Sequence, residues 1–120
     1  MKTWAVVGLG NNPERAAFGV AKLLQDKGHR IIPVYPRAET VLGEVGYKTL
    51  SEIPGPIDVV DCFVNSTLVG KVVDEAIAIG AKAVWLQLDV IDNDAIARAQ
   101  AAGLITVMDR CPAIEYRKKS

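Results

Sequence analysis

The chain has 120 residues, half of them apolar, and its 14 Lys and Arg residues balance its 14 Asp and Glu residues. This length fits one domain that can bury a core without disulfides or structural metals, and the balanced charge argues against nucleic acid and against a membrane surface as partners. No secretion signal precedes the first apolar run, and every apolar run is shorter than the roughly 20 residues that span a bilayer, so we expect a cytoplasmic protein.

The first part of the chain alternates between apolar runs and a helical pattern. Thr3 to Leu9 is typical of a strand buried on both faces, and it leads into a glycine-rich turn, Gly8 to Pro13, with the sequence Gly-Leu-Gly-Asn-Asn-Pro. Apolar positions at helical spacing predict a helix from Ala16 to Lys27. The next strand is Arg30 to Val34, where Pro33 indicates a strand end or a place where one hydrogen bond is missing.

After a Gly- and Pro-rich loop, the chain continues to alternate strands and helices. The loop, Leu42 to Pro56, is expected to hold a short strand at Val45 to Tyr47 and one helical turn capped by Ser51. The alternation predicts right-handed βαβ crossovers and the α/β class: a Rossmann-like, doubly wound parallel sheet in three layers, with one domain over residues 1–120. The remaining expected strands are Ile57 to Phe63, Ala83 to Leu88 and Ile105 to Asp109, and the remaining helices are Leu68 to Ile79 and, with Asp92 as N-cap, a segment ending at Ala102.

The position of a ligand site follows from this fold class. Ligands of such sheets bind beyond the carboxyl ends of the strands, where the strand order reverses. In the usual order this point lies between the first strand and the strand that ends at Phe63. Residues that follow the strand ends are therefore the candidates for a site.

The glycine-rich turn lies between a strand and a helix, which is the context that makes a glycine motif informative. Gly8 and Gly10 allow the backbone to approach a pyrophosphate, and Asn11 and Asn12 can donate hydrogen bonds or cap the helix. Pro13 stands where the dinucleotide-binding fingerprint has its third glycine, so we expect the helix to begin later. The alternative is a tight turn without a ligand, but the predicted switch point favours binding.

The end of the second strand distinguishes between cofactors. An NAD site uses Asp or Glu there to accept hydrogen bonds from the ribose, whereas Val34 to Arg37 offers no carboxylate. Arg37 is suited to a ribose phosphate, as in NADP or coenzyme A, or is a solvated loop residue. The short chain disfavours NADP, because hydride transfer also needs a substrate site and a general acid or base.

Two later strand ends add further candidates. Phe63 and Val64 can form an apolar wall for an adenine ring or pack in the core, and Asn65 can reach a ligand or cap the next helix. Trp85 and Gln87 project from one face of the fourth strand. A buried glutamine needs a hydrogen-bond partner, which is either a ligand or neighbouring backbone.

The two cysteines are expected to stay thiols, and their spacing predicts no metal site. Cys62 lies inside an apolar strand and is predicted to be a core residue. Cys111 follows the last strand beside Arg110, where a lowered thiol pKa would permit a disulfide with a thiol ligand, although an inert cap is the commoner role.

Segments spread over nearly the whole chain match one family. They are Val7 to Leu9 with Asn11 to Arg15, Arg30 to Val34 with Pro36, Val41 to Glu44, Asp58 to Asp61, Asp74 to Ala76 with Ile79 to Lys82, Val84 to Gln87, and Met108 to Pro112. In these segments the chain resembles the small stand-alone CoA-binding proteins of bacteria and archaea, which share a domain with the N-terminal part of the succinyl-CoA synthetase α subunit.

The resemblance implies a Rossmann-like CoA-binding domain, with the first loop and the later strand ends around the nucleotide, and it does not imply an enzyme. The chain departs from the family pattern in two places. A serine is usual at or near Gly10 and polar residues are usual where this chain has Ala16-Ala17-Phe18. Arginines are usual after the strand-ending phenylalanine, where this chain has Val64-Asn65.

We therefore predict a module that binds coenzyme A or an acyl-CoA and has no catalytic residues of its own. The resemblance and the strand ends together place the diphosphate over Gly8 to Arg15 and the adenosine between Pro36-Arg37 and Phe63 to Asn65, with Trp85 and Gln87 nearby.

Two alternatives stay open. One is a small enzyme that uses NADP or an acyl-CoA, with Cys111 or Asp109 as its reactive group. The other is a regulatory interaction module that has lost its ligand. The sequence also leaves open whether the chain forms a homo-oligomer or acts with a CoA enzyme as its partner.

Overall fold

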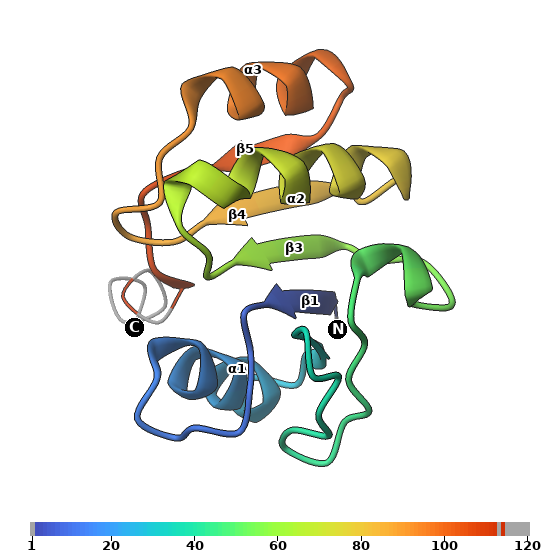
Figure 1. The fold of residues 1–120 in the computed structure, drawn as a ribbon, viewed down its shortest axis with the longest axis vertical. Helices are drawn as coiled ribbons and strands as arrows, with labels where there is room; N and C mark the ends of the chain where they lie inside the picture. Colours follow the sequence, from blue (N-terminus) through green and yellow to red (C-terminus); the bar gives the residue numbers. More distant parts are fainter. Residues whose placement is uncertain (1, 113, 115–120) are drawn as a thin grey trace.

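Five parallel strands form one sheet at the centre of the molecule (Figure 1). The computed structural model describes residues 2–112 and 114. In space the strands follow the order β2-β1-β3-β4-β5, so the order reverses between β1 and β3 as predicted. Their bounds are β1 (Thr3–Val7), β2 (Arg30–Val34), β3 (Val59–Cys62), β4 (Ala83–Leu86) and β5 (Ile105–Val107).

Helices cover both faces of this sheet and complete three layers. The helix α1 (Ala16–Asp26) lies on one face, and α2 (Ser66–Ala78) and α3 (Asn93–Ala101) lie together on the other (Figure 1). The helix α3 begins as predicted, because Asp92 Oδ1 accepts a hydrogen bond from the backbone N–H of Ala95 at 3.0 Å. The chain is therefore a single Rossmann-like α/β domain. None of its helices, within the described residues, is long and apolar enough to cross a bilayer.

The strands are apolar because the helices bury both of their faces. Ala5 and Val60 pack in the core on the α2 side, whereas Val6 and Ile31 pack in the core on the α1 side, and all four side chains are buried. Asp61 in β3 is the exception, since it is a fully buried carboxyl residue among these apolar neighbours.

The loop between β2 and β3 differs from the sequence prediction. Instead of a short strand, a backbone bridge pairs Tyr47 with Val34, and the Tyr47 N–H donates to the carbonyl of Pro33. Pro33 is tolerated because β2 is an edge strand. The expected cap of the helical turn was wrong: Ser51 lies inside the 3₁₀ helix η1 (Leu50–Glu52), and its hydroxyl bonds a carboxylate oxygen of Glu75 instead.

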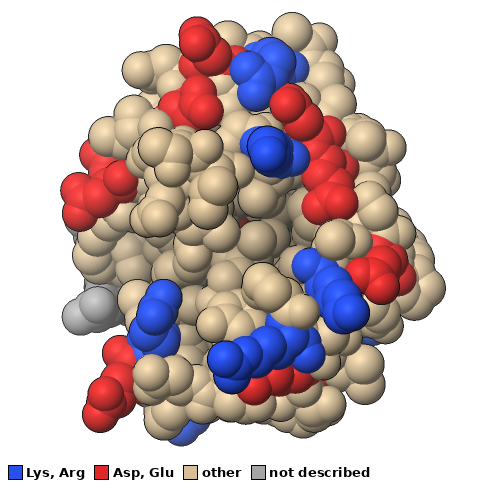
Figure 2. All heavy atoms as spheres, viewed as in Figure 1, with Lys and Arg blue, Asp and Glu red and all other residues tan. Residues whose placement is uncertain are grey.

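The surface carries both signs of charge. On the face shown in Figure 2, Lys and Arg side chains stand beside Asp and Glu side chains, and neither sign covers the face alone. This mixture agrees with the balanced composition and gives no extended basic surface on that face for a polyanion.

Candidate functional site

Three neighbouring hollows open where the strand order reverses, and all three are lined by Gly8 and Arg15. Gly8 follows β1 and Arg15 precedes α1, so both belong to the predicted turn. We name the hollows by their linings. The turn hollow, about 270 Å³, is also lined by Gly10, Asn11, Asn12, Tyr35, Arg37 and Glu39.

The other two hollows share Phe63 and Val64, which follow β3. The central hollow, about 400 Å³, is lined by Gly8, Arg15, Ala16, Ala17, Phe63, Val64, Asn65, Leu68, Gln87, Leu88 and Val90. The lysine hollow, about 370 Å³, is lined by Val7, Gly8, Arg15, Val34, Tyr35, Pro36, Lys48, Phe63, Val64, Leu68, Lys71 and Val72.

The two glycines of the turn have different reasons to be glycine. Gly8 has a φ of 100°, and a Cβ there would overlap the backbone carbonyl oxygen of Phe63. The close approach of the chain after β1 to the chain after β3 therefore requires Gly8 with or without a ligand. A Cβ on Gly10 would lie 3.2 Å from Glu39 Oε1 and 3.5 Å from the Tyr35 ring, so Gly10 keeps the turn hollow open.

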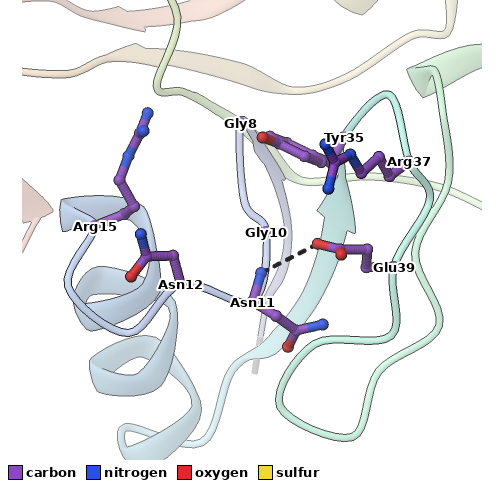
Figure 3. Close-up of a pocket in the computed structure, with 8 residues that line it drawn as sticks. All are labelled: Gly8, Gly10, Asn11, Asn12, Arg15, Tyr35, Arg37 and Glu39. Carbon is purple, nitrogen blue, oxygen red and sulfur yellow. Dashed lines mark hydrogen bonds between the residues drawn. The ribbon is translucent and has the colours of Figure 1, made fainter.

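A carboxylate lies beside the turn, because Glu39, two residues beyond the stretch Val34 to Arg37, lines the turn hollow. The backbone N–H of Asn11 donates to Glu39 Oε1 at 3.2 Å (Figure 3). The chain reverses after β2, where the Ala38 N–H donates to the Tyr35 carbonyl and Ala38 has a φ of 50°. This reversal returns Glu39 to the turn, which the strand pattern alone did not reveal.

Cationic side chains flank the turn hollow from both sides. In Figure 3, Tyr35, Arg37 and Glu39 lie on one side of the turn, and Asn12 and Arg15 lie on the other. Arg37 is thus at the site where a ribose phosphate was predicted, with the carboxylate of Glu39 in the same hollow. Charge alone therefore does not define this hollow as an anion site.

Both helices that begin at the central hollow lack a side-chain cap. Arg15 and Asn65 occupy the N-cap positions of α1 and α2, and neither side chain makes a capping hydrogen bond. Asn12 caps only the turn before α1, since its Oδ1 accepts from the N–H of Glu14 at 3.0 Å. The Phe18 and Leu68 N–H groups donate to the carbonyls of Arg15 and Asn65, and the two amide groups before each of them have no acceptor among the described residues. Such amide groups attract anions.

The lysine hollow combines apolar walls with cations. Phe63 and Val64 form part of its apolar lining, as the sequence predicted for an adenine site, and Pro36 lies with them. Lys48 and Lys71 also line it, and sequence reasoning missed both. Lys48 comes into reach because its neighbour Tyr47 bridges to β2, and Lys71 because it lies one turn into α2.

Trp85 and Gln87 have different surroundings, because Trp85 lies in β4 and Gln87 lies one residue beyond its end. Trp85 packs 5.7 Å from Trp4, measured between ring centroids, and its Nε1 donates to the carbonyl of Arg110 at 2.8 Å. Trp85 lines none of the three hollows, whereas Gln87 lines the central one. The structure thus separates Trp85 from the other predicted site residues.

The side-chain amide of Gln87 is hydrogen-bonded to a buried carboxyl group. Gln87 Nε2 donates a hydrogen bond to Asp61 Oδ1. Burial raises the pKa of Asp61 to about 8, with the bond from Gln87 acting in the opposite direction. Burial, and then the neighbouring Asp61, also raise the pKa of the Cys62 thiol, which is a core residue as predicted. The sequence signal for Asp61 was a carboxyl residue inside an apolar strand, and it was overlooked.

The residues named for an alternative enzymatic role have structural contacts. Cys111 packs against the core on the α1 side and is partly buried. Asp109 Oδ1 accepts a hydrogen bond from the backbone N–H of Asp89 at 2.7 Å, which ties the ends of β4 and β5 together. Neither Cys111 nor Asp109 lines any of the three hollows.

Comparison with known proteins agrees with this arrangement. The chain matches the family of the CoA binding domain over residues 2–117. The uncharacterized protein YneT of Bacillus subtilis (strain 168) is 36% identical over 110 residues, which are 92% of this chain and 82% of that protein. Subunit alpha of the ADP-forming acetate–CoA ligase II from Pyrococcus furiosus is 35% identical over 81 residues, which are 67% of this chain but 18% of that subunit.

A solved structure shares the fold and is similar in sequence. A hypothetical protein from Pyrococcus horikoshii OT3 superposes with a TM-score of 0.93 at 41% identity, and the match covers 98% of this chain and 82% of that one. The family match extends over almost every residue, and the sheet has the strand-order reversal that the sequence predicted. The chain therefore belongs to the CoA-binding domain family.

Proposed function

We propose that this protein binds coenzyme A or an acyl-CoA at the carboxyl ends of β1, β2 and β3, without catalysis of its own. The observation that carries the proposal is that three hollows of different chemistry adjoin at Gly8 and Arg15. Coenzyme A also has three chemically different parts, which are a phosphorylated adenosine, a diphosphate and a long pantetheine arm. One hollow is available for each part.

The diphosphate is assigned to the glycine turn. Gly10 keeps the turn hollow open, and Arg15 stands at the uncapped start of α1. Uncapped amide groups and a guanidinium together favour a phosphate over a neutral group. Loss of the usual polar residues at Ala16 and Ala17 leaves this work to backbone amides and Arg15.

The adenosine is assigned to the lysine hollow, between Pro36-Arg37 and Phe63 to Asn65. Phe63 and Val64 offer an apolar surface for the base, and Arg37 lines the adjoining turn hollow from the loop after β2. Lys48 and Lys71 add cations near the same walls, where a phosphate on the ribose would meet them. The arm of the ligand would then extend into the central hollow, towards Gln87.

A dinucleotide is the second candidate, because Glu39 supplies a carboxylate close to the glycine turn. NAD-binding domains use such a carboxylate to accept hydrogen bonds from a ribose. Glu39 already accepts one hydrogen bond from the Asn11 N–H, so a ribose would share or displace that contact. The two candidates therefore predict different ligands for the same turn.

Thermal unfolding with coenzyme A, dephospho-coenzyme A, NADP, NAD and ATP tests the proposal. A ligand at about 100 times its dissociation constant adds about 2.7 kcal/mol to the free energy of unfolding. We expect coenzyme A to stabilise the chain most. Stabilisation by NAD or NADP without any by coenzyme A would replace the proposal with the dinucleotide candidate, and no stabilisation by any of the five would favour an interaction module without a nucleotide.

A matched pair of variants shows whether binding uses this end of the sheet. Arg15→Met removes the cation that lines all three hollows, whereas Arg30→Met removes an exposed cation at the start of β2, the opposite end of the sheet. Coenzyme A should protect the Arg30→Met variant as it protects the wild type, and should protect Arg15→Met less. Equal protection of the two variants would place the ligand elsewhere.

We further propose that the protein binds its ligand in the cytoplasm, in line with the sequence prediction.

A further inference from the structure

The carboxyl group of Asp61 is in an unfavourable place for an acid. Asp61 lies in β3, at the middle of the five-stranded sheet, and pairs in register with Val6 of β1 and Trp85 of β4. Its exposure is 0%, and its Oδ2 has no hydrogen-bond partner among the described residues. A buried polar atom without a partner costs stability, so its presence in a native core needs a reason.

The reason we find is the bond to Gln87. Gln87 Nε2 donates to Asp61 Oδ1, across 26 positions in the chain. The backbone of Gln87 is also held, because its carbonyl accepts from the Val90 N–H at 2.9 Å. The side-chain amide is thus fixed with its nitrogen directed into the core, which leaves its carbonyl oxygen as the free end.

That oxygen is the part of Gln87 offered to the central hollow. Gln87 is 5% exposed and lines the hollow. Gln87 Oε1 accepts no hydrogen bond from a described residue. It is nevertheless not among the buried side-chain polar atoms without a partner, which in the described part of the chain are Trp4 Nε1 and Asp61 Oδ2. Gln87 Oε1 is therefore not fully buried, and it is accessible beside the apolar walls formed by Phe63 and Val64.

We infer that Asp61 is a positioning residue, which holds the Gln87 amide so that its carbonyl oxygen accepts a hydrogen bond from an N–H group of the ligand in the central hollow. The inference rests on the proposed function, because the pantetheine arm of coenzyme A carries two secondary amides with such N–H groups. An acceptor among apolar walls discriminates strongly between a ligand with an N–H donor and one without it.

The protonation of Asp61 is consistent with this role. Its raised pKa keeps the carboxyl group neutral at pH 7, so the core contains no unpaired charge. A neutral acid still accepts the Gln87 N–H through a carboxyl oxygen. Asparagine has the same shape and the same kind of acceptor, which makes Asp61→Asn the conservative variant and Asp61→Val the disruptive one.

Titration calorimetry at pH 7 with two ligands tests the inference. The ligands are coenzyme A and adenosine 3′,5′-bisphosphate, which lacks the arm. Gln87→Met removes the acceptor at nearly constant volume, and we expect it to weaken coenzyme A binding about three- to tenfold while leaving adenosine bisphosphate unchanged. Asp61→Val should weaken coenzyme A binding to a similar degree, whereas the Asp61→Asn variant should bind coenzyme A as tightly as the wild type.

The double variant Asp61→Val with Gln87→Met adds a readout that a purely structural role would not produce. If Asp61 acts through Gln87, the second substitution causes no further loss of coenzyme A affinity. If Asp61→Val does not fold, the comparison of Gln87→Met with Asp61→Asn decides the matter: the first must lose affinity for coenzyme A alone, and the second must keep it.

The outcomes separate this inference from the proposed function. A wild-type chain that binds neither ligand would refute the proposed function and this inference with it. A wild-type chain that binds coenzyme A, with a Gln87→Met variant that binds it equally well or loses both ligands in parallel, would refute only the inference. A folded Asp61→Val variant with unchanged affinity for coenzyme A would do the same.

Discussion

The turn hollow and the central hollow meet at Gly8 and Arg15, but the polar groups that line them differ in charge and in exposure to solvent. The turn hollow carries opposite charges, Arg37 and Glu39, on loop residues that solvent reaches. The central hollow carries a neutral amide, Gln87, fixed by a buried acid. Water and salt weaken interactions of exposed charges, whereas a buried hydrogen bond is costly to disturb. We therefore expect large stability effects around the central hollow and smaller, salt-dependent affinity effects around the turn hollow.

The largest expected effect is a pH dependence of stability that originates at Asp61. In the folded chain Asp61 keeps its proton up to about pH 8, whereas its ordinary pKa is 3.8. Because the folded-state pKa is the higher one, the contribution of this proton is complete below the unfolded pKa and is lost as pH rises through the folded one. The slope is about 1.4 kcal/mol per pH unit, on the order of 6 kcal/mol in all.

Urea unfolding of the wild type and of Asp61→Asn, measured at a series of pH values between about 4 and about 8, isolates this effect. The difference between the two curves removes the contribution of every other titrating group, and the Cys62 thiol stays protonated because its pKa is raised. We expect the wild type to lose stability relative to Asp61→Asn as the pH rises from about 4 to about 8. Parallel curves would mean that Asp61 is not a protonated core residue.

The next largest effect is expected at the point where the hollows meet. In Gly8→Ala the new Cβ overlaps the Phe63 carbonyl oxygen at a φ of 100°, so strain and steric overlap add. We expect a loss of about 3 kcal/mol or more in the free energy of unfolding, measured by urea denaturation.

Gly28→Ala is the matched control for Gly8→Ala. Gly28 has a φ of 87°, but a Cβ there meets no atom within 4 Å. It therefore reports the backbone strain alone, about 1 kcal/mol. Similar losses in the two variants would contradict the close contact of Gly8 with the Phe63 carbonyl.

A smaller effect is expected for the cation of the turn hollow. Arg37→Met should weaken coenzyme A binding about three- to tenfold and leave dephospho-coenzyme A unchanged, because only the first ligand carries a ribose phosphate. The effect should shrink as salt is added. Calorimetry with both ligands checks this, and an equal loss for both would assign Arg37 to the diphosphate.

The smallest effect is expected for the carboxylate beside the turn. Glu39→Gln keeps an acceptor for the Asn11 N–H but removes a negative charge, so coenzyme A affinity should rise about twofold. Glu44→Gln, in the same loop and outside the three hollows, should change nothing. A Glu39→Gln variant that loses affinity, most of all for NAD, would favour the dinucleotide candidate.

Much of the site was predictable because it follows strand ends. Gly8, Gly10, Asn11 and Asn12 do line the turn hollow, and Phe63 to Asn65 do line the central one. Their placement needs only the order of strands and helices, which periodicity reveals. The strand lengths were less accurate, since the apolar pattern continues to Leu88 although the β4 ladder ends at Leu86.

The missed residues share a different property. A loop reversal brings Glu39 to the site, a backbone bridge beside Lys48 brings that lysine, and Lys71 reaches the site from the second turn of a helix. Trp85, by contrast, was predicted in the site but packs against Trp4. These placements depend on the path of the whole chain. Local sequence patterns contain no information on which side chains meet across such distances.

By itself, the sequence determined the fold class and the end of the sheet where a ligand site would lie. Both follow from short-range patterns, because buried parallel strands are apolar runs and helices repeat every few residues. Only the tertiary structure decided which polar groups meet there. The pairing of Gln87 with Asp61 and of the Asn11 amide with Glu39 joins residues far apart in the chain. The core leaves Gln87 and Asp61 few other partners, whereas the loop after β2 brings Glu39 to the exposed turn.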